Sequence, residues 1–182
     1  MHPARSLGPV LVVLAMLPAP LAAAGSEDTF TPPAPTETVE TCADGLVWDL
    51  ATETCLPPSE STNDDSAMMN DARALAHAGR YADAGAVLDL LDAGDPWVLT
   101  YRGFLARKTG DQEASRQFYL AALRIDPDHL LARSYMGQGM VEAGDLDGAR
   151  AELTRIRASG GRGTWPEFSL RLALDRGRGF TY

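Results

Sequence analysis

The chain has 182 residues, of which 45 % are hydrophobic, and its formal net charge at pH 7 is −9. This length suits one small domain with tails, and the hydrophobic content suits a packed core. The acidic balance argues against proteins that bind nucleic acid or anionic lipid, because both functions need a basic face.

Residues 1–24 predict a cleaved secretory signal. The apolar run at residues 7–17 is too short to span a bilayer, which takes about 20 residues. Small residues at Ala22 and Ala24 suit a cleavage site near Ala24. We therefore expect a secreted or periplasmic protein with no membrane insertion after cleavage, and an uncleaved interfacial anchor is the alternative. Neither Asn63 nor Asn70 begins an Asn-x-Ser/Thr sequon, which favours a bacterial periplasm.

The next residues predict a linker and then a small disulfide-closed hairpin. Residues 25–41 are rich in Thr, Pro and Glu without an apolar period, which is typical of an extended, solvated linker. Cys42 and Cys55 are the two cysteines, and an exported chain usually pairs two such thiols. Between them a turn and two short strand patterns predict a β-hairpin over 42–55. A second linker at 56–65 leads us to expect that the hairpin folds independently of the C-terminal residues.

The hairpin segment resembles half of a peritrophin-type chitin-binding domain, with its C-x-x-G-hydrophobic-aromatic pattern starting at Cys42. The family uses more cysteines than this chain has. The resemblance implies that Trp48 stacks on a sugar ring, and the alternative is that Trp48 packs on the hairpin itself. A metal site is not expected, because two cysteines without nearby His do not provide four ligands.

From residue 66 onward the chain repeats one pattern of turn and amphipathic helix. The turn glycines Gly79, Gly110 and Gly144 are 31 and 34 residues apart, and such a period is typical of a repeat protein. Asp126 and Pro127 end one helix and suit the N-cap and first position of the next. Thr164 and Glu167 have capping-box spacing and predict a further helix that closes the array. The expected helices are 66–78, 81–92, 96–108, 111–124, 128–142, 145–158 and one starting near 164.

This pattern resembles the tetratricopeptide repeat, a helix-turn-helix unit of roughly 34 residues. In the second unit the motif maps onto Leu99, Gly103, Gly110, Asp111, Ser115, Tyr119, Ala122 and Pro127. The early Trp of the family is missing from all three units. The resemblance implies an all-α fold of about three tetratricopeptide-repeat helical hairpins at 66–176, with a C-terminal capping helix and a loose tail at 177–182. An ordinary bundle of helical hairpins is the alternative.

The family's concave groove implies a candidate peptide-binding surface. Its positions carry over to Met69, Arg73, His77, Trp97, Thr100, Phe104, Arg107, Lys108, Ser134 and Gln138. Rings supply contact area and Arg supplies directional bonds, and exposed Arg107 and Lys108 beside Trp97 and Phe104 would favour an extended ligand with acidic and apolar residues. In the alternative interpretation Trp97 and Phe104 seal the contact with the first unit and the charges are solvated.

The sequence contains no recognisable catalytic constellation. Its three histidines are far apart, and it lacks a phosphate-binding P-loop and a Gly-x-Ser-x-Gly elbow. We therefore expect a protein that is not an enzyme and has no catalytic, cofactor or metal site. The favoured function is an exported adaptor or scaffold that binds a protein segment in its groove. The alternatives are carbohydrate or cell-wall binding through the Cys42–Cys55 hairpin and an accessory subunit of an envelope enzyme complex.

Overall fold

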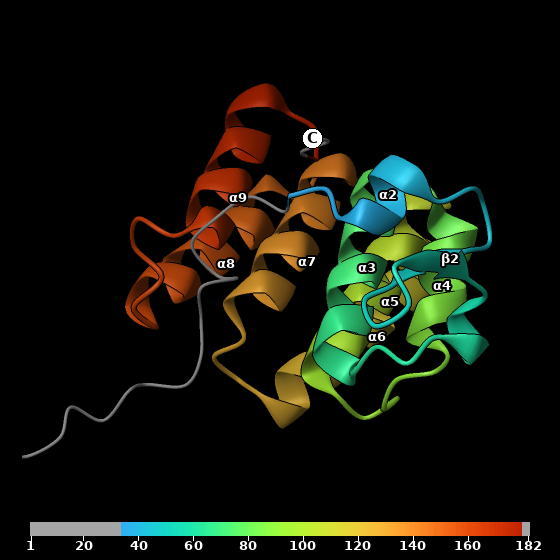
Figure 1. The fold of residues 1–182 in the computed structure, drawn as a ribbon. Helices are drawn as coiled ribbons and strands as arrows, with labels where there is room; N and C mark the ends of the chain where they lie inside the picture. Colours follow the sequence, from blue (N-terminus) through green and yellow to red (C-terminus); the bar gives the residue numbers. More distant parts are fainter. Residues whose placement is uncertain (1–33, 180–182) are drawn as a thin grey trace, which may run out of the picture.

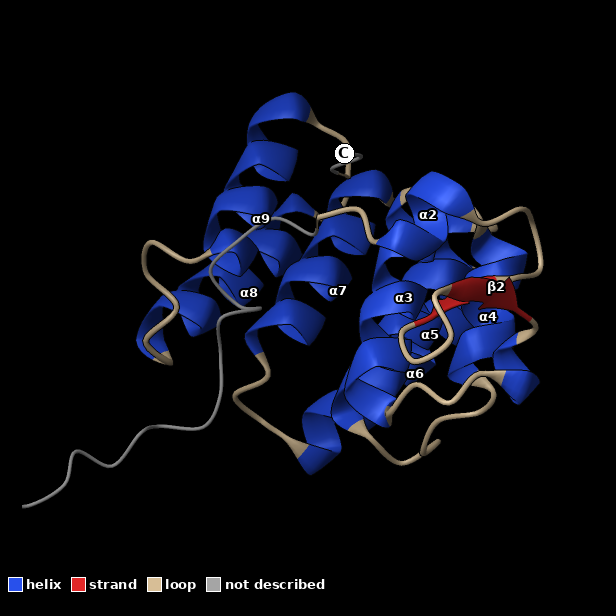
Figure 2. Ribbon diagram, viewed as in Figure 1, coloured by secondary structure: helices blue, strands red, loops and turns tan. Residues whose placement is uncertain are grey.

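The computed structural model describes residues 34–179, and the predicted signal at 1–24 lies outside this part of the chain. The described residues are mostly helical with one small β-hairpin (Figures 1 and 2). The elements are α2 (Glu37–Thr41), β1 (Val47–Asp49), β2 (Thr54–Leu56), the 3₁₀ turn η1 (Pro58–Glu60), α3 (Asp65–His77), α4 (Tyr81–Leu88), α5 (Pro96–Lys108), α6 (Gln112–Ile125), α7 (Leu130–Glu142), α8 (Leu146–Ala158) and α9 (Trp165–Arg176).

Three antiparallel helical hairpins, α3/α4, α5/α6 and α7/α8, stack side by side (Figure 1). Each hairpin turns at one of the repeating glycines: Gly79, Gly110 and Gly144 have φ of +81°, +96° and +81°. L-residues rarely adopt this left-handed conformation, so glycine is the residue that these turns favour. The prediction of repeating helical hairpins is therefore confirmed.

Two predicted helix boundaries differ from the structure by two or more residues. α4 ends at Leu88 instead of near residue 92: the Leu90 and Leu91 amides donate to carbonyls three residues back, and the Asp92 side chain accepts a hydrogen bond from the Gly94 amide in the turn that follows. α7 starts at Leu130 instead of 128. Asp126, predicted to cap α7, ends α6 and accepts a hydrogen bond from the Asp128 amide.

Small residues allow the helices within and between hairpins to approach closely. A Cβ atom added at Gly103 in α5 would lie 2.6 Å from Cε1 of Tyr119 in α6. A Cβ atom at Gly137 in α7 would lie 2.8 Å from Cδ2 of Leu170 in α9. Ser115 and Ala122, two small motif positions of α6, are also buried. α9 packs on both α7 and α8 and closes that end of the stack, which confirms its predicted place after the last hairpin.

The predicted β-hairpin is present, and its disulfide joins Cys42 to Cys55 with the Cα atoms 5.6 Å apart. β1 pairs with β2 in antiparallel register, with Trp48 opposite Cys55. The hairpin does not stand apart from the helices. Val47 is 1 % exposed and belongs to the same apolar cluster as Met68 and Leu75 of α3.

The segments on both sides of the hairpin are ordered, contrary to the predicted linkers. In the described end of the first linker, residues 37–41 form α2, and the Thr36 hydroxyl donates to Asp71 of α3 at 2.8 Å. In the second linker the Thr62 amide and hydroxyl donate to buried Asp49. A segment rich in Thr and Pro is expected to be solvated when its polar groups find no partner within the protein. Here the threonine side chains form tertiary hydrogen bonds, which hold the segments in place.

The described part of the predicted loose tail, residues 177–179, contacts the helices, although Gly177 and Arg178 are exposed. Gly177 ends α9 with φ of +67°, and the Arg178 amide donates to the Ala173 carbonyl. Gly179 lies against the side chains of Glu142 and Arg107. Residues 180–182 lie outside the described part of the chain.

Candidate functional site

The first helices of the three hairpins, α3, α5 and α7, pack in sequence and share an aromatic cluster. His77 of α3 lies 5.0 Å from Phe104, and Phe104 lies 5.1 Å from Tyr135 of α7, measured between ring centroids. Tyr101 is 6.1 Å from Tyr135 in an edge-on arrangement. The Tyr135 hydroxyl and His77 Nε2 are hydrogen-bonded at 3.2 Å. These rings hold the three first helices together and support the surface on which a ligand was predicted.

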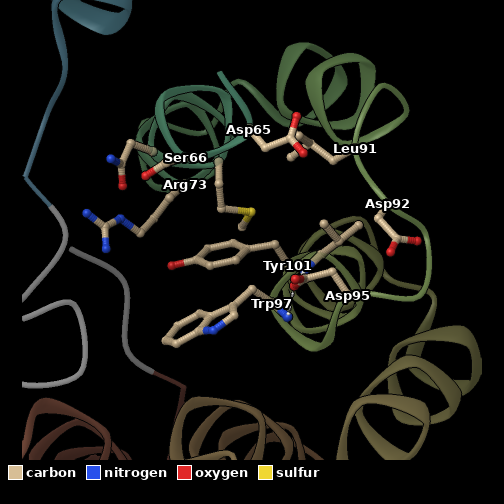
Figure 3. Close-up of a pocket in the computed structure, with 11 residues that line it drawn as sticks. Asp65, Ser66, Arg73, Leu91, Asp92, Asp95, Trp97 and Tyr101 are labelled. Atoms are coloured by element: carbon tan, nitrogen blue, oxygen red, sulfur yellow. Dashed lines mark hydrogen bonds between the residues drawn. The ribbon is translucent and has the colours of Figure 1, made fainter. Parts of the chain in front are cut away.

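A cavity of about 250 Å³ opens between α3 and α5, at the end nearest the α4–α5 turn (Figure 3). The side chains of Met69, Trp97 and Tyr101 form its apolar part, with the Trp97 and Tyr101 rings extending in the same direction. Met69, Arg73 and Trp97 are positions at which the sequence predicted groove residues. The cavity is therefore lined by predicted groove residues from both α3 and α5.

Charged groups lie on opposite sides of this cavity. Asp65, Asp92 and Asp95 line one side, where Asp65 starts α3 and Asp95 caps α5 through hydrogen bonds from the Trp97 and Val98 amides. Arg73 lies toward the other side, beside Tyr101 (Figure 3). The cavity thus has an acidic end and a basic end with aromatic surface between them.

Arg107 does not take the exposed position that the sequence predicted. It is 3 % exposed, and its Nη1 atom donates to Glu142 Oε1 of α7 at 2.6 Å. The predicted role of Arg107 as an exposed ligand contact is therefore wrong. The physical reason is that α7 packs against α5 and provides a carboxylate partner, which a pattern within α5 alone does not reveal.

Lys108 and His77 are partly accessible and lie in a locally positive environment. The Lys108 Nζ atom lies 5.4 Å from the Phe104 ring centroid, and burial together with Arg107 lowers the pKa of Lys108. Burial, with Arg73, Lys108 and Arg107 nearby, lowers the pKa of His77 to about 3. His77 is therefore neutral at neutral pH and serves as a polar member of the aromatic cluster.

Four further predicted groove residues are buried between helices. Phe104 lies within the aromatic cluster, and the Thr100 hydroxyl donates to the Pro96 carbonyl of its own helix. On α7, Ser134 is hydrogen-bonded to Ser169 of α9 at 3.0 Å, and Gln138 joins the same pair. α9 covers this face of α7, so Ser134 and Gln138 are not presented for a ligand.

The partly accessible members of the predicted groove set are Met69, Arg73, His77, Trp97 and Lys108. The sequence missed Tyr101, Asp65 and Asp92 as cavity residues. Tyr101 falls on the predicted groove helix, but a helical period does not show that its ring borders a cavity. Asp65 and Asp92 lie at a helix start and in a loop, and tertiary packing brings them together.

Within residues 34–179 no cluster of three or more His, Cys, Asp or Glu side chains has an arrangement that could hold a metal ion. In the same part of the chain no helix combines the length and the apolar character needed to cross a bilayer. Comparison of the chain with protein-family models, with curated proteins and with solved structures gave no match.

Proposed function

We propose that this chain is an exported, non-enzymatic adaptor or scaffold of the tetratricopeptide-repeat kind, which binds an extended protein segment on the face formed by α3 and α5. The three stacked hairpins with left-handed glycine turns support the repeat assignment. The disulfide indicates an oxidising compartment and supports export through the signal predicted at residues 1–24.

The cavity between α3 and α5 is the observation that carries the binding proposal. It offers Trp97 and Tyr101 side by side with Met69, and aromatic residues with Met and Arg are enriched where proteins bind other proteins. Met is also flexible enough to adapt to different apolar side chains. The partly buried Tyr135–His77 pair holds α7 against α3 and so helps to preorganise the cavity.

Site-specific photocrosslinking tests this proposal. A photoreactive residue at position 69 lies in the cavity, and one at position 168 replaces exposed Phe168 on α9 as the control. Crosslinking in the native envelope should give a discrete protein adduct from position 69, and Trp97→Ala should reduce it several-fold while circular dichroism stays unchanged. The same adducts from position 168, or none from position 69, would contradict the proposal.

A second candidate, glycan binding at the hairpin, is favoured by one observation. Trp48 lines a cavity of about 180 Å³ together with polar Thr36, Asn63, Asn70 and Asp71. An indole beside hydrogen-bonding groups suits a sugar ring. Trp48→Ala should then abolish retention of the folded protein on insoluble cell-wall polysaccharide, whereas Trp97→Ala should not. Equal retention of both variants would rule this candidate out.

A further inference from the structure

The two charged ends of the α3–α5 cavity restrict the ligand more closely than the repeat fold does. We propose that the bound segment carries a basic side chain, an apolar anchor and an acidic side chain within about five consecutive residues, the basic side chain at Asp65, Asp92 and Asp95 and the acidic one at Arg73. This inference rests on the proposed function, and it replaces the acidic and apolar ligand that exposed Arg107 and Lys108 would have favoured.

The size of the cavity limits how large the apolar anchor of the ligand can be. Pockets for drug-sized ligands enclose about 300–1,000 Å³, so a cavity of about 250 Å³ suits one or two side chains of a longer segment. Its apolar lining includes Met69, Val98 and the rings of Trp97 and Tyr101. A leucine, methionine or aromatic side chain buries its apolar surface there.

The acidic end calls for a cation. Three carboxylates line one side of the cavity, and none of the three forms an ion pair with another residue in the described part of the chain. Asp92 and Asp95 each use one carboxylate oxygen, Oδ1, for backbone amides. A basic side chain that enters from the ligand would balance this concentration of negative charge.

The basic end lies about four residues away along an extended ligand. Asp65 and Arg73 are eight residues apart on α3, which corresponds to about 12 Å at 1.5 Å per helical residue. An extended chain advances about 3.3 Å per residue and covers this distance in about four residues. Arg107 and Lys108 of α5 add to the positive field on this side, with Glu142 as the partner of Arg107. An acidic side chain four residues from the basic one therefore meets Arg73.

Selection from a random dodecapeptide display library tests the inference with the oxidised protein. Clones are selected on the native chain and counter-selected on Trp97→Ala, so that only ligands that need the cavity survive. The expected common pattern is basic–x–apolar–x–acidic, in either chain direction. If no clone prefers the native chain over Trp97→Ala, the proposed function itself fails. If clones prefer the native chain but share no such charge pattern, the function stands and this inference is overturned.

A double-mutant cycle on one selected peptide then locates the basic end. Asp65→Asn with Asp92→Asn should weaken binding of the peptide by about two- to tenfold, the range expected for partly exposed charge pairs. The same substitutions should have no effect once the basic residue of the peptide is replaced by glutamine. Asp147→Asn, on the exposed face of α8, is the matched control and should leave affinity unchanged. Equal weakening of both peptides by the cavity variants would overturn the assignment.

Discussion

Arg107 links α5 to α7 through a pair that is only partly enclosed. Its own side chain is buried, with the guanidinium carbon 5.6 Å from the Phe104 ring centroid, whereas the side chain of Glu142 is 29 % exposed. The position therefore tolerates loss of the charge better than reversal of the charge, because unpaired Glu142 keeps access to water but a second carboxylate beside it would not.

We predict that Arg107→Glu destabilises the protein by about 3–5 kcal/mol, because it buries an unpaired carboxylate next to Glu142. Arg107→Met should be markedly less destabilising, since it keeps most of the apolar contacts of the side chain. Lys108→Glu on the neighbouring, partly exposed position serves as the control, with an expected change below about 1 kcal/mol. Urea denaturation followed by circular dichroism measures all three, and equal effects of Arg107→Glu and Lys108→Glu would show that Arg107 is accessible.

His77 makes the free energy of unfolding depend on pH in the mildly acidic range. Its pKa is about 3 in the folded chain and about 6.5 in an unfolded one, so between these values the unfolded state binds a proton that the folded state does not. Stability therefore falls as pH falls through this window, by about 1.4 kcal/mol per pH unit from this residue.

His77→Phe should remove that dependence. Between about pH 6 and pH 4.5 the native chain is expected to lose about 2 kcal/mol more than the variant, measured by urea denaturation at each pH. His129, whose pKa burial also lowers, contributes equally to both proteins and cancels in the comparison. Parallel curves for the two proteins would contradict the assigned protonation of His77.

At the scale of helices, two glycines inside helices differ in the space that surrounds them. Gly103 lets α6 approach α5, because the ring of Tyr119 occupies the place of a Cβ atom. Gly85 in α4 has ordinary space, with Leu105 Cδ1 at 3.9 Å from an added Cβ atom. The two positions form a matched pair for testing the packing of the hairpins.

We predict that Gly103→Ala destabilises the protein by about 1–3 kcal/mol through overpacking against Tyr119. Gly85→Ala should instead stabilise it by about 0.5–1 kcal/mol, because alanine favours the helix interior and meets no obstacle there. Thermal and urea melts of the two variants measure the difference. Destabilisation by Gly85→Ala to the same extent would mean that α4 and α5 are closer than described.

The helices could be predicted from sequence because local signals set their ends. Four helices begin at a residue whose side chain accepts a hydrogen bond from a backbone amide in the first turn: Asp95, Asp111, Asp145 and Thr164. The candidate site could be predicted only in part, because exposure depends on what packs over a helix. Nothing within α7 indicates that α9 covers Ser134 and Gln138, or that Arg107 of α5 reaches Glu142.

At the scale of the whole molecule, the β-hairpin belongs to the helical core. Composition predicts a solvated linker at 25–41, and the predicted linker at 56–65 makes the hairpin a separate unit, but neither pattern shows that Val47 enters the cluster of α3 and α4. The hairpin, α2 and the first helical hairpin therefore form one packed unit at one end of the stack, with α9 at the other end (Figure 1).

We predict that Cys42→Ser lowers the stability of the helices themselves, by about 3 kcal/mol for a closed loop of this size. Val47→Ala, which leaves the disulfide intact, should destabilise the same transition by about 1–3 kcal/mol through the cavity that it creates. Urea denaturation monitored by the helical circular dichroism signal tests both. An unchanged helical midpoint in both variants would show that the hairpin folds independently.

Arg80 occupies the turn position that Asp111 and Asp145 hold in the other two hairpins, and its side chain does not cap α4. It donates to the carbonyls of Cys42 and Ala43 at 3.0 and 2.8 Å, and its Nε atom donates to Asp83 in the first turn of α4 at 2.8 Å. Arg80→Asp should provide a side-chain cap for α4 and remove the hydrogen bonds to the carbonyls of Cys42 and Ala43. The two changes should have opposite effects on native-state hydrogen exchange in the two segments. Amides in the first turn of α4 should gain protection while those of residues 47–56 lose it. Arg80 thus fastens the residues before β1 to the start of α4, beside the contacts of Thr36 and Val47, without providing the cap that Asp111 and Asp145 provide.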